Sequence, residues 1–280
     1  MINVGEYNKL RVARKVDFGF YLSDEKGNEV LLPNGSLNGN NIEVNSTINA
    51  FIYRDSSDRL IATLKTPKIQ VGKLAYLEIV SQSSFGAFAD MGLERDIFIP
   101  LKEQKFKLLK GKKYILYAYV DKTGRLAATT FVDDYMDIGT GYTVDEDVTV
   151  IAYGRGGDKT IRVAIDGKYK AIILANEHYT DIYPGDILNV RIKRIYEDGV
   201  IGVTQRKKRF EARDELQEKI LQELNLNNGF MPYNDKTSPE IIKEKFKTSK
   251  NYFKMALGGL MKQGKITQNS EGTFLKNKVD

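Results

Sequence analysis

Short runs of alternating hydrophobic and polar positions fill the first 65 residues, separated by clusters of turn-forming residues. Alternation with a period of two places one side of the chain in a core and the other in water, which is the pattern of a half-buried β-strand. Residues 24–28 and Asn34-Gly35 predict turns. The predicted strands are residues 10–16, 18–22, 30–33, 47–53 and 60–64. Five short strands in this length favour a small closed barrel.

The same order of segments recurs about 67 residues later, which indicates an internal duplication. Phe18-Gly19 corresponds to Phe85-Gly86 at an offset of 67 residues. The other matched pairs are residues 29–33 with 96–100 and residues 59–63 with 125–129. This period is too long for a solenoid repeat and fits duplicated small domains. The second unit is predicted to form strands at residues 74–80, 114–120 and 126–131 around a hairpin that begins near Phe85.

A weaker copy of this plan follows in residues 143–205. Strand-like patterns cover residues 144–153, 160–165, 187–195 and 200–204. Asp198-Gly199 predicts a tight hairpin turn, and Tyr169 is the evident aromatic residue in the middle of the unit. The predicted barrels are therefore residues 1–66, 70–133 and, in divergent form, 142–205.

The hydrophobic period changes from strand-like to helical after Gln205. Helical spacing covers residues 210–226, and Ser238 before Pro239 predicts the start of a second helix that ends at residue 246. Ser249 is expected to cap a third helix that ends at residue 262. A β-hairpin is predicted from residues 266–267 and 273–275. Three helices followed by a hairpin is the order of a winged helix, so residues 210–280 are predicted to form one.

Composition excludes several kinds of chemistry. The 280 residues contain no cysteine and a single histidine, His178. Thiolate metal sites, disulfides and cysteine nucleophiles are thereby excluded, and little remains for acid–base work near neutral pH. No apolar run approaches the roughly 18 residues that indicate a membrane span, and the N-terminus lacks a signal-peptide pattern. We therefore expect a cytoplasmic protein with no membrane contact and no metal or other cofactor.

The net charge of +6 is concentrated in the C-terminal quarter of the chain. Residues 205–280 contain 16 Lys and Arg against 10 Asp and Glu. Such a basic region favours contact with a polyanion, although a basic face is often only a solvated one. Lys250 and Lys254 fall away from the apolar side of the third predicted helix, and Lys207 and Lys208 lie in the basic run before the first.

Phe85 and Phe88 form the leading candidate site of the sequence. Gly86 between bulky residues suggests a bulge or a close backbone approach, which would bring both rings onto one face despite their odd spacing. Aromatic side chains on a small sheet can stack nucleic acid bases. Burial statistics favour a core position for any single Phe, so the exposure of the two rings decides between these interpretations.

The two N-terminal units resemble S1-type RNA-binding domains, which are OB-fold barrels. In the second unit, Phe85 and Phe88 match the two stacking aromatic residues of the family, and Phe98 stands where the family usually has His. Asp121 and Arg125 match its acidic and basic positions. The corresponding residues of the first unit are Phe18, Tyr21, Leu31, Asp55 and Arg59. Leu31 departs from the family pattern at the His position.

Nearly the whole chain resembles the bacterial conserved virulence factor B (CvfB/YitL) family, most specifically in residues 229–239 and 249–254. The resemblance implies a mainly β multidomain fold, with three tandem S1-like OB-fold β-barrels followed by a C-terminal α+β winged-helix domain. It also implies a non-catalytic protein that binds single-stranded RNA and regulates gene expression post-transcriptionally, with the third barrel and the winged helix as main RNA contacts. The candidate RNA-binding residues are Phe18, Tyr21, Arg59, Phe85, Phe88, Phe98, Arg125, Tyr169, Lys207, Lys208, Lys250 and Lys254.

Three patterns suggest catalysis without the residues that it needs. Residues 154–160 are similar to a phosphate-binding loop, but Asp158 stands where a Gly is required and would repel phosphate. Ser23 and Lys26 match S-x-x-K without its accompanying motifs, and His178 is interpreted as a surface or packing residue. We predict no catalytic and no metal-binding residue.

Two other functions remain open from the sequence. A DNA-binding transcription regulator could use the Lys and Asn side chains of the winged helix on phosphates and adenine edges. An adaptor associated with the ribosome or RNA polymerase would use its barrels for protein contacts. The sequence leaves the oligomeric state open.

Overall fold

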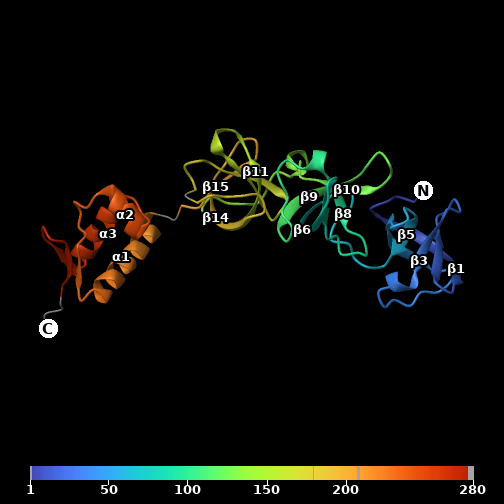
Figure 1. Ribbon diagram of the computed structural model, residues 1–280, viewed down its shortest axis with the longest axis horizontal. Coiled ribbons are helices and arrows are strands. Elements are labelled where there is room, and N and C mark those ends of the chain that lie inside the picture. The colour runs from blue at the N-terminus through green and yellow to red at the C-terminus, as the bar shows by residue number, and fades with distance from the viewer. Residues whose placement is uncertain (1, 179, 207–208, 277–280) are drawn as a thin grey trace. The chain divides into compact units, whose positions relative to one another are not determined.

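The computed structural model describes residues 2–178, 180–206 and 209–276, with the backbone alone at residues 158 and 209–214. It divides into an N-terminal unit that ends at Gln205 and a C-terminal unit that begins at Arg206. The first unit contains three closed five-stranded barrels, and the second contains three helices and a three-stranded sheet (Figure 1). The predicted fold class, three OB-like barrels followed by a winged helix, is confirmed.

The first barrel closes because its long first strand pairs with a neighbour along each half. β1 (Tyr7–Val16) pairs antiparallel with β4 (Thr47–Arg54) through its first half and with β2 (Gly19–Ser23) through its second. β3 (Glu29–Pro33) pairs with β2 and runs parallel to β5 (Leu60–Thr63), which returns along β4. Alternate residues of β1 are buried, as the period-two pattern predicts.

The second barrel repeats this pairing order. β6 (Leu74–Gln82) pairs with both β7 (Gly86–Ala89) and β9 (Lys113–Val120). β8 (Ile97–Pro100) pairs antiparallel with β7 and parallel with β10 (Leu126–Thr129), which closes the barrel on β9. Because the topology is the same, residues one repeat apart occupy equivalent places in the two barrels.

Two equivalent glycines allow the first hairpin of each barrel to close. A Cβ on Gly86 would lie 2.2 Å from the backbone oxygen of Ile99, and a Cβ on Gly19 would lie 2.2 Å from that of Leu32. Real Cβ atoms do not approach an oxygen this closely, so glycine is required at both places. The close backbone approach expected at Gly86 is therefore present.

The third barrel has the same strand order and one strand that the sequence pattern did not reveal. Its strands are β11 (Asp147–Arg155), β12 (Ile161–Ile165), β13 (Tyr169–Ile173), β14 (Ile187–Ile195) and β15 (Ile201–Thr204). The missed strand is β13, which pairs with β12 and runs parallel to β15. The glycine-rich stretch that is similar to a phosphate-binding loop connects β11 to β12 through the 3₁₀ turn Gly157–Lys159. The other 3₁₀ turns are Asn34–Ser36, Leu101–Glu103 and Asp133–Tyr135.

The barrels of the first unit share packed apolar contacts. Phe51 and Tyr53 on β4 of the first barrel are buried in the hydrophobic cluster of the second barrel. The stretch between the first two predicted barrels leads directly into this cluster, because Ile69 is also buried there. A separate buried cluster joins the second barrel to the third: Ile115, Val132, Met136, Tyr153 and Ala164. The connections are therefore parts of packed interfaces.

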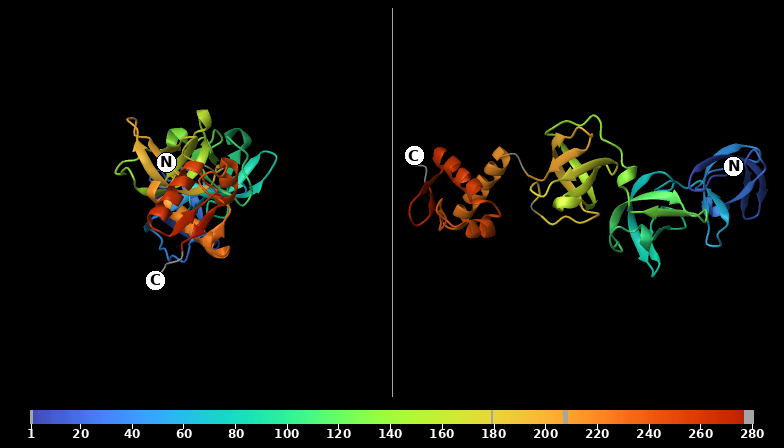
Figure 2. Two further views of the ribbon diagram at one scale, coloured as in Figure 1. Left: turned by 90° about the vertical axis from the view of Figure 1, so that its left-hand side faces the viewer. Right: turned by 90° about the horizontal axis from the view of Figure 1, so that it is seen from above.

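The C-terminal unit has the helices and the hairpin that its sequence predicts. The helices are α1 (Arg209–Leu226), α2 (Pro239–Phe246) and α3 (Lys250–Lys262), and the strands are β16 (Phe230–Met231), β17 (Ile266–Gln268) and β18 (Thr273–Leu275). The Ser238 and Ser249 hydroxyls accept hydrogen bonds from the first turns of α2 and α3, as expected of N-caps. The unpredicted strand β16 pairs with β18 and widens the hairpin to a sheet. Figure 2 shows the helices beside this sheet within the unit.

Candidate nucleic-acid interface

Two phenyl rings face each other on the outside of the second barrel. Phe88 on β7 and Phe98 on β8 are cross-strand partners, and their ring centroids are 5.1 Å apart at an interplanar angle of 38°. Both rings are half-buried, while Ala87 and Ala89 point into the core. Phe85, directly before β7, is 76% exposed. The three rings therefore form an accessible aromatic surface rather than part of the core.

These rings line a groove of about 560 Å³ that the second barrel shares with the first. The second barrel contributes Phe85, Phe88 and Phe98 together with Arg125. The first barrel contributes residues from the end of β4 and the turn that follows it, namely Tyr53, Arg54, Asp55, Ser56 and Asp58. The structure thus brings four of the sequence-predicted residues into one groove and adds a wall from the neighbouring barrel.

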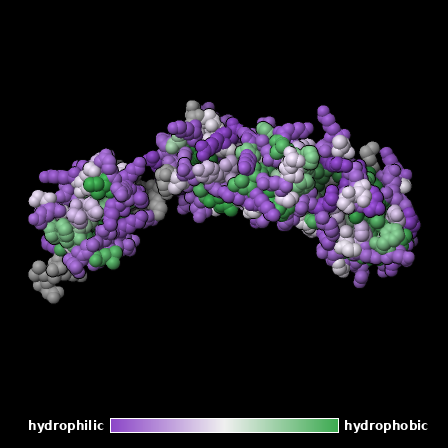
Figure 3. Space-filling view, viewed as in Figure 1, coloured by the Kyte–Doolittle hydropathy of each residue, from purple (hydrophilic) through white to green (hydrophobic). Residues whose placement is uncertain are grey.

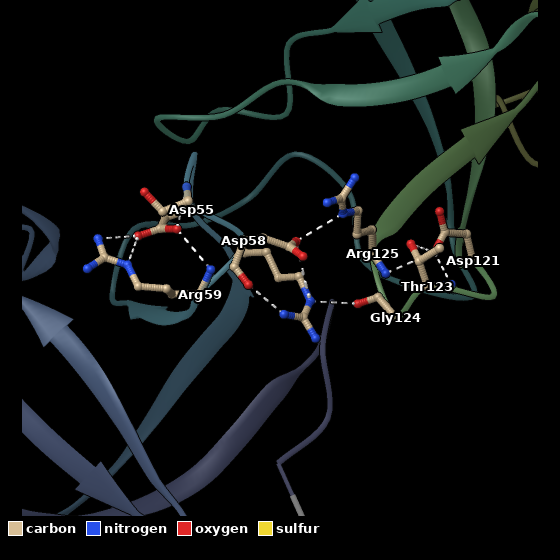
Figure 4. A network of polar contacts seen from close by, with 9 residues as sticks. Asp55, Asp58, Arg59, Asp121, Thr123, Gly124 and Arg125 are labelled. Carbon is tan, nitrogen blue, oxygen red and sulfur yellow. Dashed lines mark hydrogen bonds and ion pairs between the residues drawn. The ribbon is translucent and has the colours of Figure 1, made fainter.

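The wall of the first barrel is joined to the second by a polar network (Figure 4). Arg125 Nε lies 2.9 Å from Asp58 Oδ1. Arg54 donates to the backbone oxygens of Gly124 at 3.0 Å and of Asp58 at 2.6 Å. Arg125 is therefore already paired with a carboxylate, and a phosphate that approaches it competes with Asp58.

The charges of this network shift the pKa values of its members. The hydrogen bond from Arg125, followed by the positive charges of Arg125 and Arg54, lowers the pKa of Asp58. At Asp121, partial desolvation acts to raise the pKa of the carboxyl. Hydrogen bonds from Thr123 and from the backbone of Arg125 outweigh it, so the pKa of Asp121 is lowered as well. Both carboxylates are ionised near neutral pH and offset part of the positive charge of Arg125.

Arg95 and Asp96 also line the groove and were not nominated from the sequence. Both are exposed and directly precede β8. The available signal was the period-two pattern of residues 96–99, in which Ile97 and Ile99 are buried and Phe98 faces outward. That pattern places Asp96 on the same face as Phe98.

The equivalent surface of the first barrel is assembled differently. Phe18 is 58% exposed, but the guanidinium of Arg14 lies 3.8 Å from the ring centroid of Tyr21 and covers one face of that ring. Leu31 is the cross-strand partner of Tyr21 and supplies no ring. Arg59 forms an ion pair of 2.7 Å with Asp55 in its own turn. Phe18, Tyr21 and Arg59 do not line the groove of the second barrel.

Tyr169 is half-buried at the start of β13 in the third barrel. Its ring lies edge-on to Tyr142 at a centroid distance of 5.8 Å, and Lys168 Nζ lies 4.9 Å from its centroid. The ring also packs against the core of this barrel. These contacts leave less of the ring available for stacking than at Phe85.

The C-terminal unit presents lysines at and beyond the start of α3. Lys254 is exposed, whereas Lys250 is half-buried and its Nζ donates to the backbone oxygen of Lys236 at 3.3 Å. Lys207 and Lys208 lie outside the described residues. The other exposed lysines in the described part of this unit are Lys219, Lys236, Lys243, Lys245, Lys247, Lys262, Lys265 and Lys276. Figure 3 shows the visible face of the unit as mostly hydrophilic.

Two other features are absent from the described residues. Within residues 2–178, 180–206 and 209–276, no group of three or more His, Cys, Asp and Glu side chains is placed to hold a metal ion. None of the helices in this described part is both long and apolar enough to cross a membrane. His178, the single histidine, has Nδ1 3.0 Å from the backbone oxygen of Thr180.

Comparison with known proteins identifies the domain types. The family model of the S1 domain matches residues 4–65 and 71–131, and that of the CvfB-like winged helix domain matches residues 218–275. YitL of Bacillus subtilis is 29% identical to this chain over 97% of its length and 93% of the relative. Conserved virulence factor B of Staphylococcus epidermidis is 28% identical over 96% of each protein.

A solved structure resembles the chain over almost its full length. It is a multidomain protein with nucleic acid binding domains from Streptococcus pneumoniae TIGR4, with 25% identity and a TM-score of 0.57. The similarity covers 98% of this chain and 99% of that one. Since both domain types are matched in the observed order and the relatives align over nearly their whole length, the chain belongs to the conserved virulence factor B (CvfB/YitL) family.

Proposed function

We propose that this protein is a non-enzymatic regulator of gene expression that acts after transcription by binding single-stranded RNA. The observation that carries the proposal is the accessible aromatic groove of the second barrel, in which Phe85, Phe88 and Phe98 lie beside Arg95 and Arg125. Several exposed rings in one contiguous patch mark a binding surface, whereas a singly exposed ring does not. Aromatic rings beside guanidinium groups are the arrangement that binds stacked bases and their phosphates.

The groove suits single strands rather than duplexes. Bases in a duplex are stacked on one another, whereas single-stranded bases can be splayed and stacked on protein rings. The S1 domains and the nucleic acid binding domains named for the Streptococcus pneumoniae structure support binding of this class. Since Asp58 and Asp121 offset Arg125, we expect stacking to supply more of the affinity at this groove than charge does.

Several weak sites on one chain would raise the overall affinity. Each barrel engages a few nucleotides in this proposal, and the exposed lysines of the winged helix add phosphate contacts. Joining modules in one chain turns the second binding event into an intramolecular one, so avidity exceeds the affinity of a single site when the geometry allows both contacts. Binding should weaken with salt and show modest sequence preference.

The test is the fluorescence anisotropy of labelled single-stranded RNA and duplex DNA with the full chain, across a salt series. Replacement of Phe85 and Phe88 by Ala should lower RNA affinity by about fivefold to a hundredfold per ring, since each stacked base contributes about 1–3 kcal/mol. Phe85→Ala alone serves where the double variant loses stability, because this exposed ring contributes little to the core. Phe131→Ala, on another exposed ring of the same barrel outside the groove, is the matched control.

The same titrations separate the alternatives. Preference for duplex DNA, with an affinity that falls in Lys254→Glu, would assign the winged helix to transcription control and reject the RNA proposal. An absence of binding to both nucleic acids would favour an adaptor that contacts a ribosome or a polymerase. RNA binding that Phe85→Ala leaves unchanged would remove the aromatic groove from the site.

A further inference from the structure

Asp96 places a carboxylate at the end of the aromatic surface in the groove. It directly precedes β8 and is two residues from Phe98, so the strand pleat puts both on the outer face while Ile97 points into the core. Two residues of a strand span about 6 to 7 Å. A purine that stacks on the Phe98 ring and donates a hydrogen bond from its edge can therefore reach from that ring to the Asp96 carboxylate.

The Asp96 carboxylate differs from other acidic groups of the groove in having no partner. Asp55 lies 2.7 Å from Arg59, and Asp58 lies 2.9 Å from Arg125. Within the described part of the chain, the Asp96 side chain takes part in no hydrogen bond and no ion pair. Although Asp96 is exposed, partial desolvation and then the charge of Asp90 raise its pKa above the ordinary value, against the opposing charge of Arg95. An anion in this setting gains from a hydrogen-bond donor more than the paired carboxylates do.

Charge decides which part of an RNA can supply that donor. A phosphate beside Asp96 would be repelled, so the backbone is expected to lie toward Arg95 and Arg125 on the same groove. The donor must then come from a base edge. The rings of Phe88 and Phe98 already present a surface on which a base can stack with its edge toward this carboxylate.

The four bases differ in how well they satisfy a carboxylate. Guanine presents two adjacent N–H donors, at N1 and at the exocyclic N2, which match the two oxygens of one carboxylate. Adenine and cytosine each present an amino group beside an acceptor nitrogen, which a carboxylate repels. Uracil presents one N–H between two carbonyl oxygens. Bidentate pairing discriminates between bases more strongly than a single hydrogen bond does.

We propose that Asp96 is a base-selecting residue that makes the groove of the second barrel prefer guanine. The inference rests on the proposed function, because it names the base that the same RNA site prefers. In this arrangement the guanine ring stacks on Phe98 and Phe88, its N1 and N2 hydrogens bond the Asp96 oxygens, and its phosphate lies toward Arg95.

The test compares oligouridines of about nine nucleotides, a length within the site size of an OB fold, that carry one central guanosine, adenosine, cytidine, uridine or inosine. For the full chain, guanosine should bind about tenfold more tightly than uridine. Inosine lacks the N2 amino group and should fall between them. Equal affinity for guanosine and uridine would overturn the proposal.

Asp96→Asn supplies the decisive variant, because it removes one acceptor and the charge from an exposed side chain that has no hydrogen bond or ion pair in the described fold. The guanosine preference should fall to about twofold or less, with uridine binding unchanged or slightly stronger. Glu78→Gln removes a carboxylate from the same barrel outside the groove and should retain the preference. A preference that survives Asp96→Asn would assign base selection to another residue and reject this inference.

Guanine also occurs in free nucleotides, and competition separates that source from RNA. Guanosine 5′-monophosphate should displace the labelled oligonucleotide at least about tenfold more weakly than the unlabelled guanosine oligonucleotide does, because it lacks the neighbouring bases that stack on the other rings. Equal potency would assign the groove to free guanine nucleotides instead. If all five oligonucleotides bind with equal affinity, the proposed RNA binding is supported and the guanine preference is rejected. If none of them binds, both proposals are rejected.

Discussion

The first and second barrels share one topology but present different outer surfaces. Their strands pair in the same order, and Gly19 and Gly86 meet the same close backbone contact. The second barrel exposes a ring pair at Phe88 and Phe98, whereas the first has Leu31 at the position equivalent to Phe98. The core and the hairpin glycine are therefore kept while the outward positions of β3 and β8 differ.

The acidic positions before these two residues differ as well. Glu29 lies one repeat before Asp96, and its carboxylate is 2.6 Å from Arg14. Arg14 in turn covers a face of Tyr21. In the first barrel, Arg14 therefore covers the ring and pairs with the carboxylate. In the second barrel, the equivalent ring and carboxylate remain accessible to a ligand. A duplicated fold can thus carry a binding surface in one copy, while the groups at the equivalent surface of the other copy pair with one another.

The largest predicted effect is a loss of stability, and it should follow from replacing the hairpin glycine that both barrels share. Gly86→Ala and Gly19→Ala each place a Cβ about 2.2 Å from a backbone oxygen. The hairpin must move apart, which we expect to lower the free energy of unfolding by about 1–3 kcal/mol or more. Thermal unfolding followed by circular dichroism measures the loss. Gly35→Ala is the control, because its added Cβ meets nothing within 4 Å and its φ, like that of Gly86, is not positive. Equal losses at Gly35 and Gly86 would contradict the steric account.

An exchange of the residues that distinguish the barrels should have the next largest effect. Phe98→Leu gives the second barrel the side chain of the first and should weaken binding of single-stranded RNA by about tenfold, from loss of one stacked base. Leu31→Phe gives the first barrel a cross-strand ring for Tyr21. That variant should gain affinity by less than about fivefold, since Arg14 still covers Tyr21. Anisotropy titrations measure both, and an unchanged affinity in Phe98→Leu would place the RNA elsewhere.

Release of Arg125 from Asp58 should change RNA affinity by a smaller amount. Asp58→Asn removes the carboxylate that competes with phosphate for this guanidinium. The affinity should rise by about two- to fivefold, the range that exposed ion pairs cover, with a steeper salt dependence because one more cation is available. Asp24→Asn, in a loop that does not line the groove, is the control. A decrease in affinity would show that Asp58 itself supports the site.

The smallest expected effect is on the pH dependence of stability. The hydrogen bond from Arg125 lowers the pKa of Asp58 in the folded protein relative to its usual value of 3.8. A lowered folded pKa means that the pair contributes stability above the usual value and loses it as the pH falls through the lowered one. The melting temperature of the wild type should therefore exceed that of Asp58→Asn slightly near neutral pH, and the gap should close in strong acid. A gap that widens on acidification would reverse the sign of this linkage.

The parts of the fold that follow from local pattern were predictable from the sequence. Period-two alternation located strands in all three barrels, and Ser238 and Ser249 marked the starts of two helices. Phe98 was nominated through the resemblance to S1 domains, and it faces outward beside Phe88 on the barrel. Such features depend on neighbours within a few residues, which the sequence displays directly.

The parts that depend on contacts between distant segments were not predictable. β13 was missed because its strand pattern is short and its partners lie on β12 and β15. Arg54 and Asp58 enter the groove because the turn after β4 meets the second barrel, a contact that no local pattern encodes. Arg95 and Asp96 lie close to Phe98 in the sequence, but only the structure shows that they line the same groove.

The burial of Phe51 and Tyr53 in the second barrel also has a consequence during protein synthesis. The cluster that covers them includes residues as far along the chain as Ala128, about 75 residues beyond Tyr53. At translation rates of about 5–20 residues per second, the ribosome needs roughly 4 to 15 seconds to make that stretch. Throughout this time the nascent first barrel presents two uncovered aromatic rings, so chaperone contact or pausing within residues 54–128 should influence the yield of folded protein more than events in the third barrel.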